Sequence, residues 1–305
     1  LAVTKALLES GVAYVGGYQG APISHLMDVL GDAHDILEEL DVYFENSASE
    51  ATAAAMLAAS VHYPLRGAVT FKSTVGLNVA SDALANLASG GVMGGALVIL
   101  GEDYGEGSSI MQERSHAFAM KSQMWLLDPR PNISAIVESV KHGFALSEAS
   151  NTPVMLDLRL RSCHLQGSFI AEDNVRPPMT VTDAVENPQR DLSRIVLPPA
   201  SFLHEQEKIN ARWPAAVEYI RTHQMNEFFD GADGVDDIGI IVQGGLYNTL
   251  NRSLELLGCS DAFGNTQVPM YVMNVTYPVV DEEVLEFCAG KKAVLLLEEG
   301  QPDYI

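Results

Sequence analysis

The chain has 305 residues and a formal net charge of −22, from 18 basic and 40 acidic side chains. A surface this acidic repels nucleic acid phosphates and anionic lipids, so neither is an expected partner. The length suffices for two domains that each bury a core.

The cysteines Cys163, Cys259 and Cys288 lie far apart and form no Cys-x-x-Cys pair. This spacing argues against a disulfide framework, a zinc ribbon or an iron–sulfur cluster, and no metal site is expected within the chain. The chain does not open on a charged segment followed by an apolar one, and its longest apolar stretch, 92–100, is short and interrupted by glycines. We therefore expect a cytoplasmic protein without a membrane span.

Short apolar strands alternate with helical patterns from the start of the chain. A strand candidate at 13–18 ends at a Gly-Ala-Pro turn, and apolar residues then recur at helical spacing from 26 to 40. A second strand is expected at 42–44, before an alanine-rich helix that Glu50 opens. The further expected elements are a strand at 68–71, a loop at 72–76, a helix over 77–90, and strands at 96–100 and 154–160. This alternation predicts a doubly wound, mostly parallel α/β sheet over residues 1–165.

Residues 166–234 are proline-rich, with scattered charge and little periodicity, and are predicted to be an interdomain connection. A second, smaller and incomplete α/β domain is expected at 235–305, with strands at 238–242, 270–275 and 293–297. Its Gly244-Gly245 turn lacks a full G-x-G-x-x-G fingerprint, which favours a structural or docking role over nucleotide binding. In the strand at 154–160, Arg159 and Arg161 are expected to be solvated or salt-bridged.

Glu50 has two possible roles. Ser47-x-x-Glu50 matches a capping box, in which the glutamate returns a hydrogen bond to the start of its helix, and spacing alone favours this role. Alternatively, the small residues after Glu50 create a tight apolar setting. Desolvation there would raise the pKa of the carboxyl, so that it could share a proton near neutral pH.

Polar or glycine-containing segments follow four of the predicted strands. They are 19–24, 46–50, 72–78 and 102–112. Because ligands bind outside the carboxyl ends of the strands in such sheets, we expect these segments to converge on one site.

Several of these segments carry a family likeness in their sequences. They read Gly-Tyr-Gln-Gly-Ala-Pro-Ile-Ser at 17–24, Val-Thr-Phe-Lys-Ser-Thr-Val-Gly-Leu-Asn at 69–78, and Ser108-Ser109 with Gln112-Glu113. Together with Glu50, they resemble the pyrimidine-binding domain of the thiamine diphosphate-dependent 2-oxoacid:ferredoxin oxidoreductases. The likeness is strongest to the thiamine-bearing (alpha) subunits of indolepyruvate ferredoxin oxidoreductases. Residues 235–305 resemble the transketolase C-terminal-like domain that follows in the same enzymes.

The resemblance implies oxidative decarboxylation of a 2-oxoacid through a thiamine diphosphate carbanion, with electrons passing to iron–sulfur centres and then to ferredoxin. Glu50 would be the catalytic residue and would hydrogen-bond N1′ of the aminopyrimidine. A 2-oxoacid, CoA and a second subunit are implied partners. The implied cofactor-binding residues are Gly20, Pro22, Glu50, Lys72, Val75 and Asn78, and the implied substrate-binding residues are Ala21, Ser109 and Gln112.

Two departures from the family pattern limit this interpretation. The chain has no Gly-Asp-Gly followed by Asn, which is the family's magnesium-diphosphate motif, so Mg²⁺, the diphosphate site and the iron–sulfur clusters are expected on another domain or subunit. Apart from these departures, the chain begins at Leu1 without a methionine and stops at Ile305 after an apolar run, so we expect it to be a piece of a longer polypeptide.

The second departure is Ala21, which replaces the family's substrate-contacting threonine. The missing hydroxyl favours an arylpyruvate such as indolepyruvate over pyruvate. The alternative is a non-catalytic interaction subunit that keeps the fold, in which Glu50 serves only as a helix cap.

Overall fold

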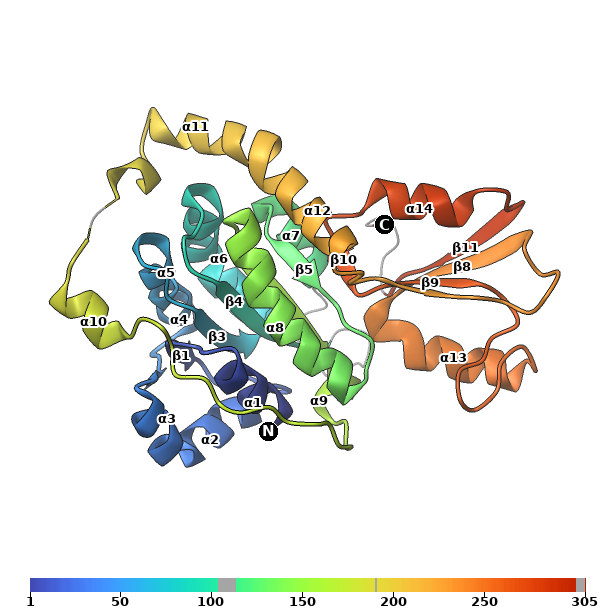
Figure 1. The fold of residues 1–305 in the computed structure, drawn as a ribbon, viewed down its shortest axis with the longest axis horizontal. Helices are drawn as coiled ribbons and strands as arrows, with labels where there is room; N and C mark the ends of the chain where they lie inside the picture. The colour runs from blue at the N-terminus through green and yellow to red at the C-terminus, as the bar shows by residue number, and fades with distance from the viewer. Residues whose placement is uncertain (104–113, 190, 300–304) are drawn as a thin grey trace.

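The computed structural model describes residues 1–103, 114–189, 191–299 and 305. It contains two β-sheets side by side, the first built mainly from the N-terminal half and the second from the C-terminal part (Figure 1). The first sheet has the strand order β10-β5-β6-β4-β3-β1-β2. Its strands are β1 (Tyr14–Gly17), β2 (Tyr43–Asn46), β3 (Gly67–Lys72), β4 (Ala96–Glu102), β5 (Trp125–Leu127), β6 (Val154–Arg159) and β10 (Val275–Tyr277).

Helices cover both faces of this sheet. One core lies under α1 (Ala2–Glu9), α2 (Ser24–Asp32), α8 (Ile133–Ser150) and α12 (Trp213–Thr222). The other lies under α4 (Glu50–Met56), α6 (Ser73–Gly90) and α7 (Ser115–Ser122). All strand pairs are parallel except that of β10 with β5. The predicted doubly wound, mostly parallel α/β fold is confirmed.

Two predictions about the helices are wrong, those for 26–40 and for 72–76. The periodic stretch 26–40 forms two helices, α2 and α3 (His34–Leu40), and the alanine-rich helix ends at Met56 before the short α5 (Ala59–His62). The expected loop at 72–76 is the first turn of α6, which starts at Ser73 after an extended Lys72. Ser73, Thr74 and Gly76 are buried in that turn, so tertiary packing overrides the weak helix propensity of this run.

The predicted connection 166–234 contains regular structure. It holds α10 (Val181–Glu186), α11 (Ala200–Glu207), a π-helical turn η2 (Lys208–Arg212), α12 and β7 (Glu227–Phe229), after the short α9 (Leu160–Cys163). The domain limits at 165/166 and 234/235 stay predictions.

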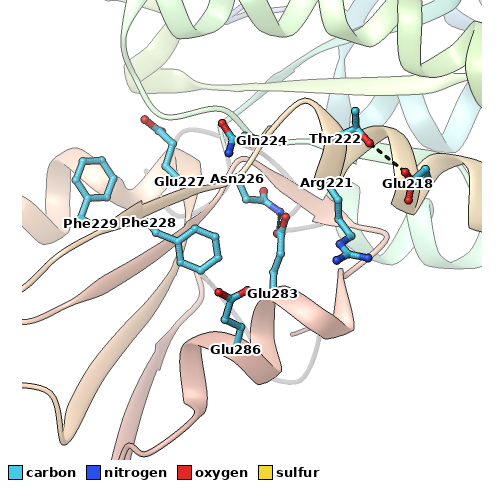
Figure 2. Close-up of a pocket in the computed structure, with 10 residues that line it drawn as sticks. All are labelled: Glu218, Arg221, Thr222, Gln224, Asn226, Glu227, Phe228, Phe229, Glu283 and Glu286. Atoms are coloured by element: carbon cyan, nitrogen blue, oxygen red, sulfur yellow. Dashed lines mark hydrogen bonds between the residues drawn. The ribbon is translucent and has the colours of Figure 1, made fainter.

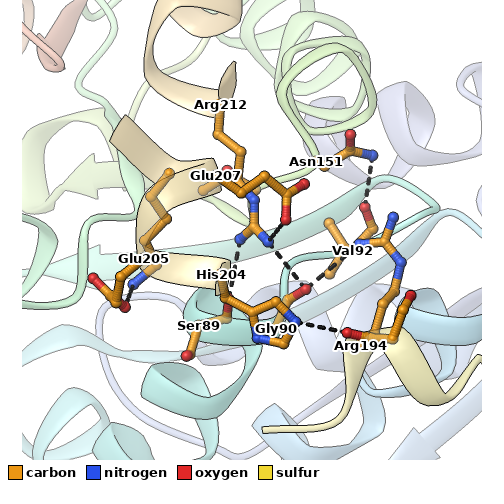
Figure 3. A network of polar contacts seen from close by, with 12 residues as sticks. Ser89, Gly90, Val92, Asn151, Arg194, His204, Glu205, Glu207 and Arg212 are labelled. Carbon is orange, nitrogen blue, oxygen red and sulfur yellow. Dashed lines mark hydrogen bonds and ion pairs between the residues drawn. The ribbon is translucent and has the colours of Figure 1, made fainter. Parts of the chain in front are cut away.

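Arg212 anchors this segment to the first sheet's helices (Figure 3). Its side chain is buried and donates hydrogen bonds to the carbonyl oxygens of Ala88, Ser89 and Gly90 at 3.1–3.2 Å. It also pairs with Glu207 at 2.8 Å. Arg212 thus satisfies carbonyl groups that the C-terminal end of α6 would otherwise leave without partners.

The second sheet has the order β11-β8-β9-β7, with β8 at Ile238–Gln243, β9 at Met270–Met273 and β11 at Ala293–Leu297. It packs between α13 (Tyr247–Leu256) and α14 (Asp281–Cys288). The prediction of one strand over 270–275 is wrong, because the chain leaves this sheet after Met273 and joins the first sheet as β10. The side chain of Asn274 fixes this crossing: it accepts from the Arg130 amide at 2.9 Å and donates to the Met225 carbonyl at 3.0 Å.

The turn after β8 packs against the first sheet. A Cβ atom on Gly244 would lie 2.2 Å from the Asp128 carbonyl oxygen, and one on Gly245 would lie 2.3 Å from Asp128 Oδ1. Only glycine fits at such close approaches, which agrees with the predicted structural role of this turn. None of the helices in the described parts of the chain is both long and apolar enough to cross a bilayer.

Candidate active site

The segments after β1, β2, β3 and β4 lie at one edge of the first sheet. Gly17 is in register with Asn46 of β2 and with Thr70 of β3, and Lys72 is in register with Gly101 of β4. Since these strands are parallel, their carboxyl ends share an edge. For the residues that the structure describes, the four segments therefore start from the same edge of the sheet, as expected.

Glu50 is the first residue of α4 and is only 6% exposed. The predicted capping box of Ser47 and Glu50 is wrong, because the helix begins two residues later than that box requires. The Ser49 hydroxyl instead accepts from the Thr52 amide at 3.3 Å, and the Thr52 hydroxyl accepts from the Ser49 amide at 3.0 Å. The Glu50 carboxylate forms no hydrogen bond or ion pair with the described residues.

Gly76 and Phe71 shape the surroundings of Glu50. A Cβ atom on Gly76 would lie 3.2 Å from Glu50 Cγ and 2.5 Å from Phe71 Cδ2. The glycine therefore lets the glutamate side chain lie against the first turn of α6. Neither Gly76 nor Phe71 is among the predicted site residues, although both belong to the 69–78 motif.

Lys72 forms an ion pair with Asp103 at 2.7 Å, and both side chains are largely buried. A Cβ atom on Gly20 would lie 2.6 Å from Lys72 Cβ, so the loop after β1 rests directly on this lysine. Asp103 Oδ1 is buried and finds no hydrogen-bond partner among the described residues. The sequence analysis did not select Asp103, although an aspartate directly after a buried strand is a usable signal.

The other predicted site residues differ in their surroundings. Val75 is half-buried, whereas Asn78 is exposed and its amide donates to the Thr74 carbonyl at 3.0 Å. Ala21 is exposed, and Pro22 lines a cavity of about 180 Å³ whose lining does not include Glu50. The predicted substrate residues Ser109 and Gln112 lie outside the described residues.

A larger pocket of about 800 Å³ lies away from this edge, between α12, β7 and α14 (Figure 2). Four glutamates, Arg221 and two phenylalanines are among its lining residues, and none of the predicted site residues is. Its carboxylates make it unsuitable for a diphosphate. Among the described residues, no group of three or more His, Cys, Asp and Glu side chains could hold a metal ion.

The residues at the strand edge fit one part of thiamine diphosphate. Glu50 is a buried carboxyl that has no partner in the described parts of the chain, and it lies beside a helix turn where glycine leaves space. Such a carboxyl can receive the flat, nitrogen-bearing aminopyrimidine. The diphosphate lacks an equivalent site among the described residues, since the nearby ammonium of Lys72 is already neutralised by Asp103.

No protein-family model matches the chain. It is 30% identical over 301 residues to the protein of Methanothermobacter thermautotrophicus named indolepyruvate oxidoreductase subunit IorA, an alignment that covers 99% of this chain and 46% of that one. The chain is similar in sequence to an IorA subunit over nearly the whole of its own length. It is also 28% identical over 303 residues to the IorA subunit of Thermococcus kodakarensis, with 99% of this chain and 44% of that one covered.

This relationship confirms the resemblance that the sequence motifs indicate. The chain spans about half the length of the IorA relatives it matches. A solved structure, 2-oxoglutarate:ferredoxin oxidoreductase from Magnetococcus marinus with 2-oxoglutarate, coenzyme A and succinyl-CoA bound, superposes with a TM-score of 0.71 at 17% identity. The superposition covers 97% of this chain and 56% of that chain, and it shows a shared fold.

Proposed function

We propose that the chain is the pyrimidine-binding part of a thiamine diphosphate-dependent 2-oxoacid:ferredoxin oxidoreductase that decarboxylates indolepyruvate or another arylpyruvate. The observation that carries the proposal is Glu50, a buried carboxyl at the carboxyl-terminal edge of a parallel sheet, which has no hydrogen-bond or ion-pair partner among the described residues. The relationship to the IorA subunits supports the substrate class.

Thiamine diphosphate, when bound, supplies the electron sink that decarboxylation of a 2-oxoacid requires. The role of Glu50 is to share a proton with N1′ of the aminopyrimidine. The absence of a competing donor among the described residues leaves its carboxylate oxygens available for that bond. Burial strengthens the bond, because water does not screen or replace it.

Gly76 and Phe71 position this carboxyl. The missing side chain at Gly76 lets Glu50 lie against α6, and Phe71 packs against the same glycine. The Lys72–Asp103 pair holds the loop around Gly20 near the same edge. We propose that Mg²⁺, the diphosphate and the iron–sulfur clusters are held by a further domain or a partner subunit, with ferredoxin as electron acceptor and CoA or water as acyl acceptor.

Replacement of Glu50 by glutamine tests this function in the complete, assembled enzyme. Glu50→Gln keeps the shape of the side chain but cannot hold the shared proton, so indolepyruvate-dependent viologen reduction should fall by about 100-fold or more. Exchange of the C2 proton of the cofactor, followed by NMR, should slow in parallel, while the melting temperature stays unchanged.

Glu45→Gln provides a matched control, because Glu45 is an exposed residue of β2 on the same edge. It should retain full turnover. Unchanged C2 exchange in Glu50→Gln would contradict the catalytic role and favour a non-catalytic subunit that keeps the fold.

A further inference from the structure

A cluster of buried carboxyl groups lies where the ends of β4, β5 and β6 meet the second sheet. Asp157 of β6 is 1% exposed, and Asp128 and Glu102 are buried beside it. Glu299 reaches the cluster from the segment after β11. Arg159 is the guanidinium at its centre, so the charges of these carboxyls are not balanced within the cluster.

The hydrogen bonds of Arg159 go to other members of the cluster and not to Asp157. Its Nε and Nη2 donate to the two oxygens of Asp128 at 3.1 and 2.6 Å, and Nη2 also donates to Gln243 Oε1 at 2.8 Å. Its Nη1 pairs with Glu299. Arg159 therefore joins the first sheet to the ends of β8 and β11, as its predicted salt-bridging role requires.

Asp157 has no donor for either carboxyl oxygen among the described residues. Glu102 of the neighbouring strand β4 is in register with Arg159, two residues beyond Asp157, so its side chain is the diagonal neighbour of Asp157 on the same face of the sheet. Glu102 also accepts from the Ser115 amide at 3.1 Å. Two carboxylates can only accept, so a proton is needed to join them. Burial raises the pKa of Asp157 well above its usual range, and the negative charges of Glu102 and Asp128 raise it further.

We infer that Asp157 and Glu102 form a proton-binding site that is occupied at neutral pH and that holds together the junction between the two sheets. Asp157 is the donor and Glu102 the acceptor. With the proton bound, the hydrogen bond replaces the repulsion between two buried carboxylates. The inference does not depend on the proposed function.

The other titratable groups that the structure describes next to the site, His116 and Cys163, add no compensating charge. His116 of α7 contacts the Gln243 amide at 3.3 Å, and burial lowers its pKa, which keeps the ring neutral. Burial raises the pKa of Cys163 in α9 to about 12, so it remains a thiol. Loss of the proton therefore leaves the carboxylates of Asp157, Glu102, Asp128 and Glu299 around the guanidinium of Arg159.

The pH dependence of stability follows from this arrangement. Because the pKa of Asp157 in the folded protein lies above its unfolded value of about 4, the folded state binds one more proton than the unfolded state between those two values. The free energy of unfolding must therefore fall as the pH rises through this window. Asp157→Asn replaces the protonated carboxyl by a neutral amide donor and removes this contribution.

Infrared spectroscopy of the full chain at pH 7 tests the inference. The wild type should show the carbonyl band of a protonated carboxylic acid, shifted in D₂O. Asp157→Asn should lose this band and unfold with a weaker dependence on pH. Asp82→Asn, which alters an exposed carboxyl of α6, should retain both features.

Glu102→Gln provides a second variant in case Asp157→Asn does not fold. The new amide donates to Asp157 and lets it ionise, so the band should again disappear. Absence of the band from the wild type at pH 7, or its survival in either Asp157→Asn or Glu102→Gln, would overturn the inference.

Discussion

Glu50 occupies the first position of α4, yet the helix does not depend on it. The capping hydrogen bonds come from Ser49 and Thr52. A negative charge in the first turn adds about 0.3–1 kcal/mol through the helix dipole, which is a small part of the stability of a domain. Substitution of Glu50 can therefore separate catalysis from folding.

Gly76→Ala should disturb Glu50 through a single methyl group. That methyl would lie 2.5 Å from Phe71 and 3.2 Å from Glu50, and overpacking of this kind costs about 1–3 kcal/mol. The gain in helix propensity, about 1 kcal/mol, offsets only part of this cost. We expect a net loss of about 1 kcal/mol in urea unfolding and a larger proportional loss of turnover.

Gly31→Ala is the matched control for this change. Gly31 is also in a helix, α2, but a Cβ atom there would meet nothing within 4 Å. This variant should be stabilised by up to about 1 kcal/mol and should keep its activity. Equal behaviour of the two alanine variants would show that the space beside Glu50 is not critical.

Ala21→Thr tests the origin of substrate choice. Suppose that the Gly20-Ala21-Pro22 loop lines the 2-oxoacid pocket. Alanine then lacks the hydroxyl that would hydrogen-bond a small polar substrate, and its small side chain leaves space beside an apolar wall. Burial of an aryl group, at about 25 cal/mol per Å², compensates for that hydroxyl. We expect a higher kcat/KM for indolepyruvate or phenylpyruvate than for pyruvate, and a smaller difference in Ala21→Thr. A wild-type preference for pyruvate that the substitution leaves unaltered would place Ala21 outside the pocket.

At the level of elements, α6 connects the candidate site to the segment at 166–234. Its first turn carries Gly76, and its last turn is held by Arg212 from the π-helical turn η2. The distant segment therefore fixes the axial position of the helix against which Glu50 lies.

Arg212→Met should release this end of α6. The change removes the donors for the carbonyls of Ala88, Ser89 and Gly90 and leaves Glu207 without its partner. Hydrogen bonds from a charged group contribute about 1.5–3 kcal/mol, so we expect a loss of about 3 kcal/mol in chemical denaturation. Arg252→Met, which breaks an exposed pair with Glu255, should cost less than about 1 kcal/mol. Similar losses in the two variants would show that Arg212 has no special anchoring role.

Elements whose patterns are local could be predicted from the sequence. The strands β1 to β4 are short apolar runs with glycine or polar residues at their ends. Their alternation with helices along the chain was sufficient to predict the fold class. The start of α6 was not predictable, because Ser73 to Gly76 have weak intrinsic helix propensity and their burial, with α6 packed against α4, is not visible in the local pattern. The crossing at Asn274 depends on partners at Arg130 and Met225, far away in the sequence.

The same division applies to the candidate site. Glu50 was found through a motif. That Glu50 takes no part in capping its helix depends on α4 beginning at residue 50, which the motif does not show. Asp103 and Phe71 gain their roles only when β3 and β4 are paired and the side chains of Lys72 and Glu50 are in place. These are contacts across strands and helices that periodicity does not encode.

The whole molecule carries a net charge of −22, and this bears on the binding of an anionic cofactor. Such a charge disfavours a diphosphate unless Mg²⁺ and dedicated ligands offset it. The described residues provide the setting for the aminopyrimidine but no equivalent setting for the diphosphate.

The isolated chain should therefore not bind thiamine diphosphate at micromolar concentrations, with or without Mg²⁺. Isothermal titration calorimetry on the chain alone should show no heat of binding, while the complete enzyme should bind the cofactor. Tight, magnesium-dependent binding to the isolated chain would reveal a diphosphate site within it.

Strand β10 has a consequence for how such proteins can be recombined. It follows β9 of the second sheet directly, yet it hydrogen-bonds to β5 and completes the first sheet. A fragment that stopped at residue 234 would lack this strand and present β5 as a bare edge, which invites aggregation. The two sheets are thus not interchangeable modules. A gene fusion that exchanges the C-terminal unit must also supply a strand that fits beside β5, which ties the evolution of the two parts together.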